Sequence, residues 1–296
     1  MAIERGDIRD LGSQLDLDAV RRFVDLVGYY AEGFKSGLVP YAWQSRQLEE
    51  LLAGLTPDNL PQDVTARVNY YNKLNTQVSL GNDIAVKDLP RKQSRYFYDL
   101  MTVAKPFGPD RRLAYLFGDI KKTPDTPTIV KSRPIAGNNN NSVLMNLNKF
   151  RHFRFAKDRV PFEEKSPTAV WRGRLCNQMR LTLAQKFEAH PSFDIGYTTK
   201  GSRIGFDRHE VAPKPSLSVV QQCHHRYIIS IEGNDVATNL KWIMSSNSLC
   251  LSPVLKYETW FMEGKLQPGV HFAEISRDFE DLEETIAYYE THPDEA

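Results

Sequence analysis

The chain has 296 residues, of which 41% are hydrophobic and 25% charged, a composition typical of a globular protein rather than a disordered or fibrous one. Its 38 basic and 37 acidic residues leave a formal net charge of +1, which excludes a polycation that coats nucleic acid. At about 150 residues per domain, the length predicts two domains.

The sequence predicts neither a membrane span nor a leader. No apolar run approaches the roughly 18 residues of a transmembrane helix, and residues 1–18 are charged without an apolar centre, unlike a secretory signal. Cys176, Cys223 and Cys250 are an odd number without C-x-x-C spacing, so we expect neither a disulfide framework nor a structural zinc site. Together these features predict a cytoplasmic protein.

The N-terminal part of the chain has the pattern of helices. Apolar residues recur there at i, i+3 and i+4, and Asp16 or Asp18 is the predicted N-cap of the first helix. Residues 94–103 fit either a helix or a strand. The predicted helices cover residues 17–31, 43–55 and 63–74.

The pattern changes beyond residue 109. Residues 113–117 form a short apolar run that ends at Gly118-Asp119, which predicts a buried strand. Residues 128–130 predict another strand, and residues 134–142 predict a loop because of their Pro, Gly and Asn content.

Strands and helices alternate from residue 169 to the C-terminus. The predicted strands are 169–171, 193–198, 226–231, 248–251 and 270–275, and the predicted helices are 177–189, 218–223, 236–244, 258–262 and 279–291. This alternation predicts an α/β fold with a doubly wound, mostly parallel sheet. Such sheets bind ligands at the carboxyl ends of their strands. The polar segments that directly follow predicted strands are Gly118-Asp119, residues 131–133, 172–174 and 232–235, and Ser252-Pro253.

The segment 232–241 has the pattern of a ligand-binding strand end. A strand ends at Gly233, and a helix is predicted to begin near Asn234 or Asp235. Glycine lets the backbone approach a ligand, and the N–H groups of a helix N-terminus bind phosphate. Lys241 follows about two turns into that helix. Alternatively, Asn234 or Asp235 only caps the helix, and Asp235 would repel a phosphate unless it contacts a sugar hydroxyl.

The stretch 149–159 carries five basic residues and one acid, interleaved with three phenylalanines. It fits a nucleic-acid patch, a basic solvent face with phenylalanines toward the core, or a surface for an anionic acceptor such as lipopolysaccharide; the second interpretation is favoured. The only D-x-D, Asp16 to Asp18, lies at a predicted helix start, so no carboxylate pair for a metal–diphosphate is evident. His224-His225 is interpreted as structural.

Six long segments follow one another along the chain: YLFGD (115–119), VKSRPI (130–135), NSVLMNLNKFRHF (141–153), VWRGR (170–174), YIISIEGNDVATNLKWIMSSNS (227–248) and PVLKYETWFMEGKLQPGVHF (253–272). Together they resemble glycosyltransferase family 90, most of all its bacterial lipopolysaccharide (LpsA-type) branch. The eukaryotic relatives in this family are the Rumi-like protein O-glucosyltransferases and the fungal capsule xylosyltransferases.

The resemblance implies a GT-B architecture, in which two Rossmann-like domains face a cleft. An acceptor-side domain with a helical N-terminal extension would cover residues 1–160, and a domain that binds the nucleotide sugar would cover residues 161–296. The implied reaction is a metal-independent, inverting sugar transfer, from a UDP-hexose or UDP-xylose to a hydroxyl of a cell-surface glycan such as lipopolysaccharide core. The implied partners are this donor and a glycan or lipid-linked acceptor, with peripheral contact at the inner membrane and without nucleic acid or a cofactor.

The resemblance also assigns site residues. Asp119 matches the general base of the Rumi-like relatives, and Arg172 matches the donor-contacting Arg of their F-R-G-S motif. The expected donor-binding residues are Lys131, Arg133, Arg172, Gly173, Gly233, Asn234, Asp235, Val236, Ala237, Thr238, Asn239 and Lys241. Those relatives place an Arg at the diphosphate where this chain has Asn239, so anchoring here is expected from Arg172, Lys241 or the Lys131/Arg133 pair. The alternative function is a non-catalytic protein that binds a nucleotide sugar or a polyanion.

Overall fold

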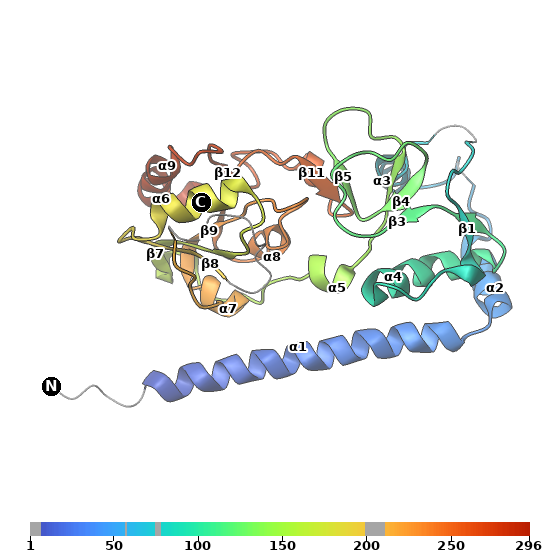
Figure 1. The fold of residues 1–296 in the computed structure, drawn as a ribbon, viewed down its shortest axis with the longest axis horizontal. Coiled ribbons are helices and arrows are strands. Elements are labelled where there is room, and N and C mark those ends of the chain that lie inside the picture. Colours follow the sequence, from blue (N-terminus) through green and yellow to red (C-terminus); the bar gives the residue numbers. More distant parts are fainter. Residues whose placement is uncertain (1–6, 57, 75–77, 199–210) are drawn as a thin grey trace. The chain divides into compact units, whose positions relative to one another are not determined.

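The computed structural model describes residues 7–56, 58–74, 78–198 and 211–296 and is a mixed α/β structure with parallel sheets (Figure 1). Contacts divide the chain into two units. One unit contains residues 1–65 and 82–113, and the other contains residues 66–81 and 114–296. The domain boundary predicted near residue 160 stays a prediction.

The first unit is mainly helical. Its regular elements are α1 (Asp7–Leu38), α2 (Tyr41–Leu52), α4 (Ser94–Ala104) and an antiparallel pair of β1 (Ile84–Ala85) with β2 (Arg112–Leu113). The stretch 94–103, which fitted a helix or a strand, is therefore a helix. Asp16 and Asp18 lie inside α1, so the predicted N-cap at these residues is wrong. The ammonium of Lys105 donates to the carbonyl oxygens of Ser36 and Gly37 at the C-terminal end of α1, where the last carbonyls of a helix have no partner within the helix itself.

The N-terminal part of the second unit is built on a small parallel sheet. Helix α3 (Gln62–Tyr71) leads into it from the first unit. The sheet has the order β3 (Tyr115–Leu116), β4 (Thr128–Val130) and β6 (Ser142–Leu144). Strand β5 (Ser132–Pro134) instead pairs antiparallel with β11 (Tyr257–Thr259), which belongs to the C-terminal part of the same unit. This pairing joins the two parts of the second unit.

The C-terminal part contains the predicted five-stranded parallel sheet. Its order is β12 (Ala273–Glu274), β10 (Leu249–Ser252), β9 (His225–Ile229), β7 (Ser166–Gly173) and β8 (Phe193–Tyr197), with every neighbouring pair parallel. Numbered along the chain and read from β8 to β12, this is the order 2-1-3-4-5 of a doubly wound sheet. Its direction of winding reverses between β7 and β9, so the crevice that binds ligands in such folds lies at their carboxyl ends.

Alternating side chains give this sheet two apolar faces. Ala169 and Trp171 of β7 pack with helices α6 (Gln178–Phe187) and α9 (Leu282–Thr291), which lie together on one side of the sheet (Figure 1). Val170, between them, packs on the opposite face with α7 (Val219–Gln222) and α8 (Leu240–Ile243). Because the period of a strand is two, burial on both faces requires the nearly continuous apolar runs seen in the sequence.

The remaining short elements are α5 (Lys149–His152), η1 (Val86–Asp88), η2 (Lys105–Phe107), η3 (Phe162–Glu164), η4 (Glu263–Lys265) and η5 (Pro293–Glu295). The predicted single strand 113–117 is wrong, because Leu113 pairs in the first unit and Tyr115–Leu116 in the second. The predicted helix 258–262 is also wrong, because Glu258 lies opposite Arg133 in the β5–β11 ladder and forms an ion pair with it.

Candidate active site

Asn177, which caps α6, connects the segments that follow β7 and β9. Its side-chain oxygen accepts a hydrogen bond from the Arg180 backbone N–H over 3.1 Å, as an N-cap residue does. Its amide nitrogen donates to the carbonyl oxygens of Glu232 and Gly233, each over 2.9 Å. The start of α6 and the segment after β9 are therefore fixed to each other at the carboxyl ends of the two strands.

Three charged residues from distant parts of the chain meet in one ion-paired group. Lys131, which follows β4, places its Nζ 3.1 Å from Oδ1 of Asp119 and 2.7 Å from Oδ2 of Asp235. Asn234 donates to Oδ2 of Asp119 over 3.1 Å, and Ser132 donates to Oδ2 of Asp235 over 2.5 Å. The structure thus brings together Asp119, Lys131, Asn234 and Asp235, as expected from their positions after predicted strands.

Burial and charge act differently on the two carboxylates. Burial alone raises the pKa of Asp119, but the Lys131 ammonium and the Asn234 amide outweigh it, so the net pKa is below its usual value. Burial also raises the pKa of Asp235, and there it outweighs the opposing effect of Lys131, helped by the negative charge of Asp119. Asp119 is half-buried, so it combines ionisation with access to a reactant.

The buried imidazole of His152 lies against this ion-paired group. Its Nε2 lies 3.4 Å from Nζ of Lys131, and its Nδ1 is buried without a hydrogen-bond partner. Burial, followed by the charges of Lys131 and Lys241, lowers the pKa of His152 far below its usual value. The imidazole is therefore neutral, and Lys131 is the cation that faces Asp119.

Arg172 does not lie free at the strand end. Its guanidinium forms a bidentate pair with Asp194 of β8, over 2.7 and 2.8 Å, and it also donates to the carbonyl oxygens of Trp171, Asp194 and Pro215. Gly173, the next residue, lies against Trp171, because a Cβ there would come within 2.6 Å of the indole. These contacts place both predicted donor-binding residues in the packing of β7 against β8.

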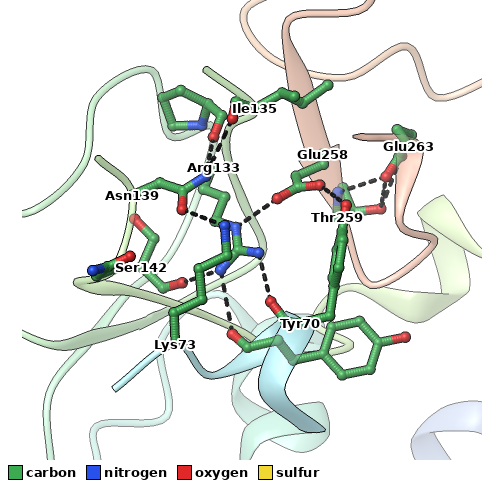
Figure 2. Close-up of polar contacts among 12 residues, drawn as sticks. Tyr70, Lys73, Arg133, Ile135, Asn139, Ser142, Glu258, Thr259 and Glu263 are labelled. Atoms are coloured by element: carbon green, nitrogen blue, oxygen red, sulfur yellow. Dashed lines mark hydrogen bonds and ion pairs between the residues drawn. The ribbon is translucent and has the colours of Figure 1, made fainter. Parts of the chain in front are cut away.

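Arg133 is the centre of a buried network (Figure 2). It donates to Glu258 over 2.7 Å, to the carbonyl oxygen of Ser142 over 2.9 Å and to that of Tyr70 over 2.6 Å. Tyr70 also donates its hydroxyl proton to Glu258. With its guanidinium fully buried, Arg133 holds α3, β5 and β11 together and does not reach the crevice.

Lys241 is likewise buried, in an ion pair with Glu263 over 2.6 Å. The helix expected to begin near Asn234 begins only at Leu240, and the residues before it form bends without regular structure. Asn239 donates to the carbonyl oxygen of Ile229 over 3.1 Å and so ties this segment to β9. Val236 and Ala237 are buried. Thr238 is partly buried.

Three arginines near the crevice were not among the predicted site residues. Arg180 donates to the carbonyl oxygens of Ile231 and Arg174, over 2.6 and 3.2 Å. Arg151 of α5 is partly buried, and its positive charge contributes to the lowered pKa of Asp119. Arg174 follows the end of β7. Arg180 had a detectable signal, because a helix capped at Asn177 places it in the first turn after a strand end.

The chain is similar in sequence to known glycosyltransferases. The family model "Glycosyl transferase family 90" matches residues 144–296. An O-glucosyltransferase LpsA of Dichelobacter nodosus is 41% identical over 278 residues, covering 91% of this chain and 85% of that protein. The chain belongs to glycosyltransferase family 90. Protein O-glucosyltransferase 2 of Danio rerio is 26% identical over 139 residues, which are 46% of this chain and 27% of that protein.

Family membership confirms the resemblance seen in the sequence, and the protein is a glycosyltransferase. It favours an enzyme over the non-catalytic binding protein that the sequence left open. Within the part of the chain that the structure describes, no group of three or more His, Cys, Asp and Glu side chains is arranged to hold a metal ion. Among the same residues, none of the helices has the length and apolar character needed to cross a membrane.

Proposed function

We propose that this family 90 member transfers a sugar from a nucleoside-diphosphate sugar to a hydroxyl of a glycan acceptor, with inversion at the anomeric carbon. The observation that carries the proposal is the half-buried Asp119 carboxylate, held ionised beside Lys131 and in contact with the segment after β9. The name of the Dichelobacter relative favours glucose as the sugar and UDP-glucose as the first donor to test. It also makes lipopolysaccharide core the first acceptor to test.

Asp119 is the proposed general base. Its carboxylate takes the proton of the acceptor hydroxyl while the hydroxyl oxygen forms a bond to the anomeric carbon. The bond from that carbon to the diphosphate oxygen breaks on the opposite face, and the electron pair leaves with the diphosphate. Lys131 keeps Asp119 ionised and fixes one of its oxygens. The second oxygen, bonded to the Asn234 amide, is the one that an acceptor hydroxyl would take over.

The proposed architecture is GT-B, with the five-stranded sheet as the donor half. The order 2-1-3-4-5 supports this assignment, because such a sheet binds nucleotides at the carboxyl ends of β7 and β9. The small sheet of β3, β4 and β6 supports the acceptor half, since Asp119 follows its first strand. A base on one half and a nucleotide site on the other fit a reaction in which closure excludes water.

We place the reaction on the cytoplasmic side, with peripheral contact at the inner membrane. The support is the state of the cysteines: Cys176, Cys223 and Cys250 are free thiols. The basic segment 149–159 is the proposed contact surface for an anionic acceptor. Its Phe155 is exposed rather than turned to the core, unlike the favoured interpretation of its sequence.

The test is a donor panel with the purified full chain. UDP-glucose, UDP-galactose and UDP-xylose are offered with a lipopolysaccharide core acceptor, with and without EDTA, and the anomeric configuration of the product is read by NMR. We expect transfer from one donor, inverted configuration and the same rate in EDTA. A retained configuration would overturn the inverting mechanism, and loss of transfer in EDTA would overturn metal independence.

A further inference from the structure

The segments that follow the three strands of the small parallel sheet meet at one edge. Leu116 lies opposite Val130, and Val130 lies opposite Leu144, so β3, β4 and β6 end at the same level. Asp119 follows β3, Lys131 follows β4, and helix α5 follows β6. Helix α5 therefore starts at the edge of the sheet that carries the proposed general base, although the proposed mechanism uses none of its side chains.

His152 is the residue of α5 that reaches the ion-paired group of Asp119, Lys131 and Asp235. Its backbone N–H donates to the carbonyl oxygen of Asn148 over 3.2 Å, which fixes it in the helical turn. The residue is 2% exposed, and its Nε2 lies 3.4 Å from Nζ of Lys131. The ammonium, which has three N–H donors, also lies 3.1 Å from Asp119 and 2.7 Å from Asp235. Nε2 is thus a neutral acceptor beside two carboxylates.

The contact with Lys131 determines which nitrogen of His152 carries the proton. Burial, and then the positive charges of Lys131, Lys241 and Arg151, keep the imidazole neutral, because they lower its pKa far below the usual value. An ammonium only donates, so Nε2 must accept, and the proton of the neutral ring is then on Nδ1. Nδ1 is buried, and within the described part of the chain no residue forms a hydrogen bond with it. No competing contact therefore selects the other tautomer.

A neutral acceptor suits the position beside Lys131. A third carboxylate there would share the ammonium and raise the pKa of Asp119, because like charges disfavour ionisation. An apolar side chain would remove this acceptor from a buried ammonium, which would then shift toward Asp235, its closer partner, and away from Asp119. The imidazole fixes the ammonium without adding negative charge.

We propose that His152 is a positioning residue for the general base. Through Nε2 it accepts a hydrogen bond from Lys131 and so keeps the ammonium against Oδ1 of Asp119, while Oδ2 faces the acceptor. The inference rests on the proposed function, in which Asp119 takes the proton of the acceptor hydroxyl. A displacement of about 1 Å at a reacting group lowers a rate by as much as about 100-fold. His152 therefore acts on the rate of transfer through Lys131.

NMR of the full chain with isotope-labelled histidine tests the contact itself. His152→Gln identifies the ring signals of His152 by their loss, and the couplings between the ring nitrogens and the carbon-bound protons distinguish the two neutral tautomers. We expect the Nδ1–H tautomer, unchanged from about pH 5 to 8. The Nε2–H tautomer, or titration of His152 in this range, would overturn the contact with Lys131 and the inference with it.

Two substitutions at His152 separate positioning from packing. Glutamine keeps a neutral acceptor near the place of Nε2, whereas leucine fills a similar volume without one. We expect His152→Leu to lower kcat about 10- to 100-fold, with UDP affinity within about threefold of wild type. His152→Gln should keep kcat within about threefold of wild type, because its amide oxygen still accepts from Lys131.

The matched control is a second histidine, which lies away from the crevice. His225 begins β9, at the end of the strand opposite the crevice, and its Nδ1 lies 2.6 Å from the hydroxyl of Thr168. His225→Leu should keep the wild-type kcat. Thermal melting checks the fold of each variant. If His152→Leu does not fold, His152→Asn replaces it, because the asparagine amide reaches only the place of Nδ1.

The outcomes separate the inference from the proposed function. If the variant without the acceptor transfers sugar as fast as His152→Gln, His152 serves packing alone; the positioning role is overturned, and the proposed donor and base stand. If the wild type transfers sugar and Asp119→Asn is equally fast, the proposed base is wrong, and the positioning role falls with it. A slow His152→Leu, a fast His152→Gln and the Nδ1–H tautomer together support the inference.

Discussion

Asn234 donates a hydrogen bond from its Nδ2 to Oδ2 of Asp119 over 3.1 Å, although 115 positions separate the two residues in the chain. This contact joins the segment after β9 to the residue after β3. Lys131 occupies the other oxygen of the same carboxylate at 3.1 Å. An acceptor hydroxyl would displace the neutral amide more easily than the ammonium, because charge-assisted hydrogen bonds are the stronger ones. In the proposed mechanism, Asn234 therefore marks the side from which the acceptor would reach Asp119.

Replacing Asp119 by asparagine should abolish most transfer while leaving the donor site intact. The substitution keeps the size of the side chain but removes the proton acceptor, and general base catalysis is typically worth about 10²–10⁴-fold. We expect kcat to fall by that factor, with UDP affinity within threefold of wild type. Asp125→Asn, in the exposed loop before β4, is the control and should retain its activity. If Asp125→Asn loses its activity and Asp119→Asn does not, Asp125 is the base.

The lowered pKa of Asp119 predicts a pH dependence that Lys131 controls. A general base must be ionised, so activity falls as pH drops through its pKa, and with the pKa below its usual value this group leaves the rate flat between pH 5 and 8. In the double variant Lys131→Met/Asp235→Asn the ammonium is gone without leaving Asp235 charged and unpaired. The acid limb of kcat/KM should then move to higher pH. Asp235→Asn alone should keep the flat profile.

Glu232 should make the folded state less stable as the pH rises toward neutrality. Burial raises the pKa of Glu232 to about 7, despite hydrogen bonds that its carboxylate accepts from the backbone N–H groups of Lys256 and Tyr257. The folded state therefore binds more protons than the unfolded chain between its usual pKa of 4.5 and 7. The contribution of the Glu232 side chain to the stability of the folded state is complete below about pH 4.5 and is lost as the pH rises to about 7.

Melting temperatures measured from pH 5 to 8 check this sign. The melting temperature of the wild type minus that of Glu232→Gln should decrease as the pH rises, because the glutamine amide does not titrate. It should become constant above about pH 7. A difference that does not change with pH would show that Glu232 has an ordinary pKa in the folded protein.

The buried pair of Arg133 and Glu258 should be a large contributor to stability. Arg133→Met leaves the carboxylate of Glu258 buried and unpaired, which costs about 3–5 kcal/mol. The double variant Arg133→Met/Glu258→Gln removes both charges and should recover part of that loss. Denaturant unfolding of the two single variants and the double variant measures this coupling. A loss below about 1 kcal/mol in Arg133→Met would contradict the network of Figure 2.

The sequence predicted those features of the fold that depend on local patterns. The apolar runs before Arg172 and Ser230 gave strands of the parallel sheet, and parallel strands bring their carboxyl ends to one edge. For this reason the strand-end segments with Asp119, Lys131 and Asn234 were expected to lie together, and they do.

The partners of buried charges were not predictable in the same way. Arg133 and Lys241 were expected at the ligand because a cation after a strand or early in a helix suits a phosphate. Their carboxylate partners, Glu258 and Glu263, come from a segment whose secondary structure depends on the pairing itself. A helical pattern at 258–262 gave way to strand β11 because the ladder with β5 brings Glu258 to Arg133. The pairing of two strands that are distant in the chain leaves no periodic pattern in a single sequence.

The sequence and the structure give Arg172 different roles. The sequence predicts contact with the donor diphosphate, whereas the structure shows an ion pair with Asp194. If its guanidinium serves the fold, Arg172→Gln loses the bidentate pair with Asp194. Because Asp194 is 38% exposed and water screens the pair, the cost should be about 1–2 kcal/mol. UDP affinity, measured below the melting transition, should then stay within threefold, and Asp194→Asn should lose similar stability. If Arg172 instead met the diphosphate, Arg172→Gln would weaken UDP binding at least tenfold while Asp194→Asn would not. Calorimetric titration of both variants separates the two roles.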